Sequence, residues 1–161
     1  MPEQREILRG KIKEYASTHI KGIDFDNDLT KVAKMYMVMI DDGHTGIWTS
    51  NSLIPFDELV KNTKGTIAPE SADIIMTNPP FGSKGKVEDP NILSEYDFGF
   101  GWKRDKKTGK FSKEKLLAGK KGGGQVPDVL FIERCVALLK KGGRMGIVLP
   151  DGDLTNQNSE F

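Results

Sequence analysis

Apolar residues recur at helical spacing in three parts of the chain, at about residues 3–18, 29–40 and 127–139. A period near 3.6 residues places apolar side chains on one face, so this spacing predicts three amphipathic helices. Apolar residues cover most sides of the third helix, which we therefore expect to be substantially buried. Pro127 favours the start of this helix. Lys140 and Lys141 favour its last turn, and Gly142 and Gly143 favour its end.

Short apolar runs of strand length alternate with these helices, at about residues 19–26, 46–53, 72–77 and 144–150. The last run follows the third helix after a short turn, which is the order of a parallel strand–helix–strand crossover. Alternating strands and helices predict an α/β fold, and 161 residues are enough for one domain. In open α/β sheets ligands bind beyond the carboxyl ends of the strands, so the residues that follow each run are functional candidates.

The run at 72–77 predicts a buried strand that stops at Asn78, and two prolines follow. Proline cannot donate to a strand ladder, so Pro79 and Pro80 must lie just past the carboxyl end of the strand. The Asn78 side-chain oxygen and the Pro79 carbonyl can both accept hydrogen bonds from an amino group, and Phe81 can stack on a planar ring. The alternative is a simple loop after a strand, in which Asn78 caps a turn.

Acceptors for an amino group beside an aromatic ring are what methyl transfer to the exocyclic amine of a planar base requires. The tetrapeptide Asn78–Phe81 resembles motif IV, (Asn/Asp)-Pro-Pro-(Phe/Tyr/Trp), of the amino methyltransferases that use S-adenosylmethionine. This resemblance implies S-adenosylmethionine as the cofactor. It also implies a catalytic site made of Asn78, Pro79, Pro80 and Phe81.

Acidic residues end the first strand-like run. An acid at the tip of the second strand of a nucleotide-type fold holds ribose hydroxyls, because a carboxylate can accept from both at once. Asp24 is our candidate for this cofactor contact, with Asp26 as the second choice. The alternative is that Asp26, Asn27 or Asp28 caps the next helix.

Polar residues also end the run at 46–53. Methyltransferases usually carry Gly-Asp-x-Leu at this place, and its acid contacts the adenine amino group of the cofactor. This chain has Asn51 and Ser52 there instead. The resemblance therefore makes Asn51 and Ser52 the candidates for the adenine end of the cofactor.

Residues 82–125 show no regular period, and we expect them to form a long irregular loop. The loop interleaves aromatic residues (Tyr96, Phe98, Phe100, Trp102 and Phe111) with many lysines and one arginine. Positive charge suits a phosphate backbone, and exposed rings can stack on a displaced base. The loop is therefore a candidate DNA-binding segment, and its candidate contacts are Lys103, Arg104, Lys106 and Lys107. The alternative is a solvated loop whose aromatic side chains pack back onto the domain.

Composition narrows the function classes. A formal net charge of +1 gives no overall attraction to nucleic acid, so DNA binding would need a local patch. Cys135 is the sole cysteine, and we expect a small core residue in a reducing cytoplasm. His19 and His44 lack metal-ligand spacing, so we expect no metal site. We find neither a leader nor an apolar run of about 20 residues, and so expect a cytoplasmic protein that does not contact a membrane.

The whole chain resembles the modification subunit of type I restriction–modification systems, an adenine-N(6) DNA methyltransferase. Four segments carry this resemblance in order and spacing: Gly22–Asp26, Thr77–Gly82, Phe131–Cys135 and Leu139–Gly152. The resemblance implies a Rossmann-like doubly wound methyltransferase sheet and a target base rotated out of the duplex. The partners that it implies are double-stranded DNA, a specificity subunit and a restriction subunit.

Two parts of the family pattern have no counterpart here. The family's first strand with its glycine-rich loop, roughly Pro-x-Cys-Gly-(Ser/Thr)-Gly-Gly, is absent before Asp24, and the chain stops soon after Gly152. We therefore expect residues 1–161 to be a partial catalytic domain that lacks the first and the C-terminal strands and is inactive in isolation. Unpaired sheet edges would favour self-association. Two alternatives stay open: a non-catalytic fragment or assembly module, and a methyltransferase that acts on RNA or on protein glutamine.

Overall fold

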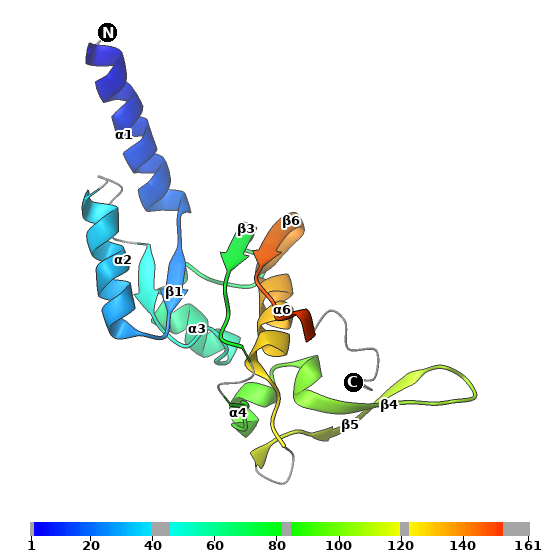
Figure 1. Ribbon diagram of the computed structural model, residues 1–161. Coiled ribbons are helices and arrows are strands. Elements are labelled where there is room, and N and C mark those ends of the chain that lie inside the picture. Colours follow the sequence, from blue (N-terminus) through cyan, green and yellow to red (C-terminus); the bar gives the residue numbers. More distant parts are fainter. Residues whose placement is uncertain (1, 40–45, 82–84, 120–122, 153–161) are drawn as a thin grey trace. The chain divides into compact units, whose positions relative to one another are not determined.

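The computed structural model describes residues 2–39, 46–81, 85–119 and 123–152 (Figure 1). Residue contacts divide the chain into two compact units. Unit 1 comprises Met1–Ser52 and Asp57–Ile67, and unit 2 comprises Leu53–Phe56 and Ala68–Phe161. Helices and strands occur in both units, so the predicted α/β class is confirmed.

Unit 1 contains one parallel pair of short strands. Its elements are α1 (Pro2–His19), β1 (Gly22–Asp24), α2 (Asn27–Met39), β2 (Ile47–Thr49) and most of α3 (Phe56–Asn62). Strand β1 pairs with β2 in a register that runs from Gly22 opposite Ile47 to Asp24 opposite Thr49. The two predicted strand runs therefore form a parallel pair, although each strand is shorter than its run.

The helices α1 and α2 form as predicted, but their apolar faces are open to solvent. Ala16 is buried on α1, whereas its large apolar side chains are 52–63% exposed: Ile7, Leu8, Ile12 and Tyr15. Helix α2 likewise exposes Leu29, Val32, Met35, Tyr36, Val38 and Met39. Apolar periodicity thus predicts the helices, whereas it does not specify what covers their apolar faces.

Unit 2 contains the predicted crossover. Strand β3 (Ala72–Thr77) pairs in parallel with β6 (Leu139–Ile147), and α6 (Pro127–Leu138) lies between them in the chain and contacts β6 (Figure 1). Strand β3 is less buried than predicted, because Ile74 is 60% and Met76 is 86% exposed.

Helix α6 ends earlier than the sequence pattern suggests. Its C-cap residue, Leu139, is already extended (φ −73°, ψ 137°), so Lys140 and Lys141 lie outside the helix. The register of β3 against β6 shifts between Ala72 opposite Leu139 and Ile74 opposite Arg144. Gly142 takes a φ of +84° within this shift, which glycine tolerates without steric cost. The predicted helix end is therefore a turn inside the strand ladder.

Residues 82–125 are more regular than predicted. Their described part contains α4 (Pro90–Leu93), the 3-10 helix η2 (Asp97–Gly99) and an antiparallel hairpin of β4 (Phe100–Arg104) and β5 (Phe111–Leu116). An isolated bridge between Val87 and Gln125 closes the segment. The hairpin escaped the pattern analysis because β5 is Phe-Ser-Lys-Glu-Lys-Leu, whose charged residues face solvent on both sides.

The core of unit 2 collects residues that are far apart in sequence. Leu53, Leu93, Tyr96 and Leu130 are buried together, and residues before and after the hairpin pack against them, among them Ile92, Leu117 and Phe131. Cys135 is buried as predicted, and burial raises the pKa of its thiol. The strand pairs β1–β2 and β3–β6 are separate two-stranded sheets among the described residues, so a single doubly wound sheet stays a prediction.

Candidate functional site

The Asn78–Phe81 segment begins immediately after β3. The ladder continues to the last residue of the strand, where Thr77 O accepts from Val148 N at 3.1 Å. Pro79 is buried, whereas Asn78 is exposed and Phe81 is 38% exposed. A buried proline holds the backbone, and the side chains on either side of it remain open to a ligand.

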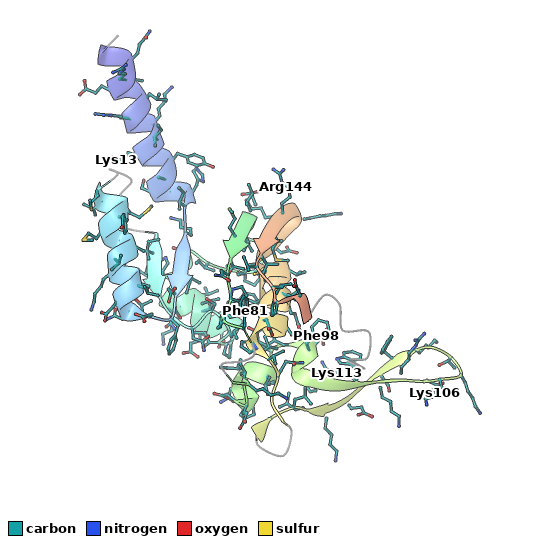
Figure 2. The ribbon with its side chains drawn as sticks, viewed as in Figure 1. Lys13, Phe81, Phe98, Lys106, Lys113 and Arg144 are labelled. Atoms are coloured by element: carbon teal, nitrogen blue, oxygen red, sulfur yellow. The ribbon has the colours of Figure 1, made fainter. Side chains whose placement is uncertain are left out.

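The Asn78 amide makes no hydrogen bond to any residue that the structure describes, so within those residues it does not cap a turn. The segment therefore offers an exposed amide, unbonded within the described residues, and a ring on a backbone with little freedom. Figure 2 shows Phe81 beyond the end of β3. This arrangement can accept hydrogen bonds from an amino group and cover the flat face of its ring. Gly82, which ends the predicted motif, lies outside the described residues.

The predicted cofactor contacts of unit 1 gather at one sheet edge. Asp24 stands opposite Thr49, and Ser50 N donates to Asp24 O at 2.9 Å. Asn51 and Ser52 follow directly and are half-buried. The carboxyl ends of two parallel strands thus bring Asp24, Asn51 and Ser52 to the same edge, as expected for a nucleotide-type site.

Asp24 and Asp26 have different local roles. The Asp26 Oδ1 atom accepts from Asp28 N at 2.7 Å and from Leu29 N at 3.1 Å, so Asp26 caps α2. The exposed Asp24 carboxylate accepts from Asp26 N at 2.7 Å through Oδ1. Its Oδ2 makes no hydrogen bond within the described part of the chain and is available to a ligand. Of the two candidates, Asp24 therefore has the carboxylate that is more open to a ligand.

The predicted DNA contacts lie at the far end of the hairpin. Lys103 and Arg104 end β4, and Lys106 and Lys107 lie in the turn, where Figure 2 shows Lys106. All four side chains are exposed. Four cations from five consecutive positions therefore make the local positive patch that the overall charge does not supply.

Asp105 orders the turn of the hairpin. Its Oδ1 atom accepts from Lys107 N at 2.7 Å and from Thr108 N at 3.0 Å. Asp105 N donates to Lys110 O at 2.8 Å, and Gly109 N donates to Asp105 O at 2.8 Å. The backbone hydrogen bonds from Thr108 and Lys107 lower the pKa of Asp105. The turn that carries Lys106 and Lys107 is thus held locally by one carboxylate.

The aromatic residues in and next to the hairpin differ in exposure. Exposed rings can stack on a displaced base, whereas buried rings pack onto the domain. Tyr96, just before the hairpin, is buried in the core. Phe111 is 60% exposed, and the Arg104 guanidinium lies 5.8 Å from its ring centroid. The Lys113 ammonium lies 3.9 Å from the Phe100 ring centroid. Tyr96 therefore packs onto the domain, whereas Phe111 is available for stacking.

Arg134 is a buried charge that the sequence analysis missed. Its side chain is 2% exposed, and it donates to Tyr96 Oη at 2.8 Å and to Ile54 O at 2.7 Å. Tyr96 Oη in turn donates to Leu53 O at 2.8 Å. The guanidinium carbon lies 3.8 Å from the ring centroid of Phe56. Arg134 thereby holds the backbone that directly follows Asn51 and Ser52. An arginine next to apolar residues in a mostly buried helix was the available signal.

Burial raises the pKa of Tyr96 to about 12, although the charge and hydrogen bond of Arg134 act in the opposite direction. Tyr96 is therefore neutral near pH 7 and can donate to the Leu53 carbonyl. The phenol and the guanidinium together satisfy backbone carbonyls that the core would otherwise bury without partners.

The comparison with protein families identifies the chain's class. A model of the family described as N-6 DNA methylase matches residues 3–161. The chain belongs to the N-6 DNA methylase family. Membership supports DNA adenine methylation in general, and with it a methyltransferase class of enzyme. A search of curated proteins finds no significant match.

The described residues contain no group of three or more histidine, cysteine, aspartate or glutamate residues that could hold a metal ion. His44 lies outside them. Within the same ranges, no helix combines the length and apolar character that crossing a membrane requires.

Proposed function

We propose that this N-6 DNA methylase transfers a methyl group from S-adenosylmethionine to the exocyclic amino group of adenine in double-stranded DNA, as a modification subunit of a type I restriction–modification system. The observation that carries the proposal is the exposed Asn78 amide beside buried Pro79, immediately after β3. The family match over residues 3–161 supports adenine in DNA as the substrate.

The side chains at this segment would orient the reacting amine. Asn78 Oδ1 and Pro79 O accept one hydrogen bond each from the two amino hydrogens, which directs the nitrogen lone pair away from both acceptors. Phe81 stacks on the adenine that has left the duplex. The cofactor supplies an activated methyl group on sulfur. The amino nitrogen would take this methyl group, sulfur would keep the electron pair as S-adenosylhomocysteine leaves, and the surplus amino proton would pass to water. Rigid acceptors favour this reaction because they need no reorganisation.

The residues at the β1–β2 edge fit the nucleoside part of the cofactor. The exposed Asp24 carboxylate has an Oδ2 atom that makes no hydrogen bond within the described part of the chain and can accept from a ribose hydroxyl. Asn51 and Ser52 offer polar groups for the adenine amino group at the same edge. In this proposal Asp26 supports the site indirectly, by capping the helix that follows Asp24.

The remaining parts of the proposal concern partners. The basic hairpin binds the phosphate backbone of DNA through Lys103, Arg104, Lys106 and Lys107. A separate specificity subunit selects the sequence, a restriction subunit completes the system, and the complex works in the cytoplasm.

A second candidate function is a non-catalytic assembly module. The open apolar faces of α1 and α2 favour it, because such faces on a folded chain commonly mark interaction surfaces. In that case the chain keeps the Asn78–Phe81 segment without turning over substrate.

Asn78→Ala tests the catalytic proposal. Methyl incorporation from labelled S-adenosylmethionine is measured into DNA, RNA and a glutamine peptide, for the chain alone and with the specificity subunit added. We expect no transfer by the chain alone. With the specificity subunit added, we expect transfer to DNA adenine only, and a loss of at least about a hundredfold in the variant. Cofactor binding by calorimetry stays unchanged.

Asn78→Asp is the matched control, since the motif accepts either residue, and we expect it to retain measurable transfer. Undiminished transfer by Asn78→Ala would refute the assignment. Transfer to RNA or to glutamine would replace DNA as the substrate. If the chain without substitutions binds no cofactor and methylates neither DNA, RNA nor the glutamine peptide, the assembly module is the function that remains.

A further inference from the structure

We infer that Glu133 is a positioning residue that sets the direction of the β4–β5 hairpin. The inference rests on the proposed function, in which this hairpin binds DNA. Both oxygens of the Glu133 carboxylate accept backbone hydrogen bonds, from Asp97 N at 2.7 Å and from Phe98 N at 3.0 Å. These two residues begin the short helix η2, and β4 follows it directly. A carboxylate on α6 thus holds the origin of the hairpin.

The other polar groups of the same two residues are also bonded. Trp102 Nε1 donates to Asp97 O at 2.9 Å, and Gln125 Nε2 donates to Phe98 O at 2.7 Å. Lys113 Nζ lies 2.8 Å from Asp97 Oδ1. Figure 2 shows Phe98 and Lys113 near α6 and Lys106 at the far end. We call Asp97 and Phe98 the root of the hairpin. Side chains from α6, β4, β5 and residue 125 meet there.

Contacts within the hairpin do not fix its orientation relative to α6, so the contacts at the root matter. A two-stranded hairpin is marginally stable in water, and this one exposes nearly all of β5. Its turn is ordered by Asp105, but that order is local to residues 105–110. The orientation of Lys106 and Lys107 relative to α6 therefore depends on the root at the start of the hairpin and on Leu116 and Leu117, which pack against the core at its end. A hairpin that is oriented before binding loses less freedom when it meets DNA.

A carboxylate is the group that fits two adjacent N–H donors. Glutamine has one oxygen acceptor, and its NH₂ group would face the second N–H donor. Glu133→Gln therefore removes one of the two bonds while it keeps the size of the side chain. Glu95→Gln is the matched control. It makes the same change of charge next to Tyr96, and Glu95 is exposed and does not bond the root.

The first measurement is made without DNA. In a Trp48→Phe background, Trp102 is the sole tryptophan and reports on the root through its fluorescence anisotropy. Amide exchange of Asp97 and Phe98 is followed in the same samples. We expect exchange about tenfold faster in Glu133→Gln and lower Trp102 anisotropy, with no change in Glu95→Gln. Glu133→Asp keeps the charge with a shorter reach and gives an intermediate effect. It replaces the glutamine variant if circular dichroism shows that variant to be unfolded.

The second measurement is the affinity for a duplex oligonucleotide over a range of salt concentrations. We expect Glu133→Gln to bind about threefold to tenfold more weakly with an unchanged salt slope, because the number of phosphate contacts stays the same. Unchanged exchange and anisotropy would overturn the positioning role, and so would a loosened root with unchanged affinity. If charge reversal at Lys106 and Lys107 leaves DNA binding unaltered, the proposed DNA contact itself fails.

Discussion

Helix α1 and the cluster around Arg134 contrast in how they form. Helix α1 spans 18 residues with a regular apolar period, yet Ile7, Leu8, Ile12 and Tyr15 remain more than half exposed. The Arg134 cluster has no periodic signature. It joins Leu53, Tyr96 and Arg134, which are up to 81 residues apart, and buries all three. Periodicity therefore identifies an element, whereas burial comes from contacts between distant residues.

Removing a side chain from the Arg134 cluster should destabilise the protein far more than removing one from the open face of α1. Arg134→Ala leaves the Ile54 carbonyl without its donor, removes one of two donors to the Leu53 carbonyl and opens a cavity, so we expect the free energy of unfolding to fall by about 3 kcal/mol or more. Ile12→Ala on the open face of α1 should change it by less than about 0.5 kcal/mol. Urea denaturation followed by circular dichroism measures both. Equal losses would remove the contrast.

The pH dependence of stability should differ between Tyr96 and Tyr15. The pKa of Tyr96 is raised to about 12 in the folded state, so its contribution is complete below pH 10 and is lost as pH rises toward 12. The expected loss is about 2 kcal/mol. Unfolding measured at pH 9 and pH 11.5 should show this loss in the unmodified chain and a smaller one in Tyr96→Phe. Tyr15→Phe, on exposed α1, should behave like the unmodified chain, and an identical pH response of Tyr96→Phe would contradict the assignment.

Charge reversal on the hairpin should affect DNA binding more than the same charge reversal on α1 and α2. Lys106→Glu with Lys107→Glu should weaken duplex binding about tenfold and reduce the salt slope by about two, because two phosphate contacts are lost. The control is Lys11→Glu with Lys34→Glu, which makes the same change of net charge on α1 and α2. Fluorescence titration over a range of salt concentrations measures both. A similar effect of the two double variants would mean that overall charge, and not the hairpin, governs binding.

Local patterns predicted the elements that depend on near neighbours. The proline at position 127 starts α6, Asp26 caps α2, and β3 ends at the Asn78 segment. Each of these follows from residues within a few positions of one another. The Asn78–Phe81 and Asp24 candidates were found in the same way, since each follows a strand and carries the chemistry in its own side chains.

Contacts over long sequence distances were not predictable. The hairpin has charged residues on both faces of β5, so its sequence resembles a loop, and its root depends on Glu133, which lies 36 residues from Asp97. The end of α6 was misplaced because pairing with β3 makes Leu139 extended. The exposure of α1 also escaped prediction, since an amphipathic pattern does not specify a partner.

The sequence by itself determined the α/β class, the order of the main helices and strands, the motif after β3 and the family. These depend on residue type and short-range spacing, which any window of the chain contains. The tertiary structure alone decided that Arg134 is buried against Tyr96 and the Leu53 carbonyl, that Glu133 anchors a basic hairpin, and that Asp24 keeps an oxygen free while Asp26 caps a helix. Polar side chains take such roles only when folding brings a complementary donor or acceptor within about 3 Å, and linear spacing does not encode that distance.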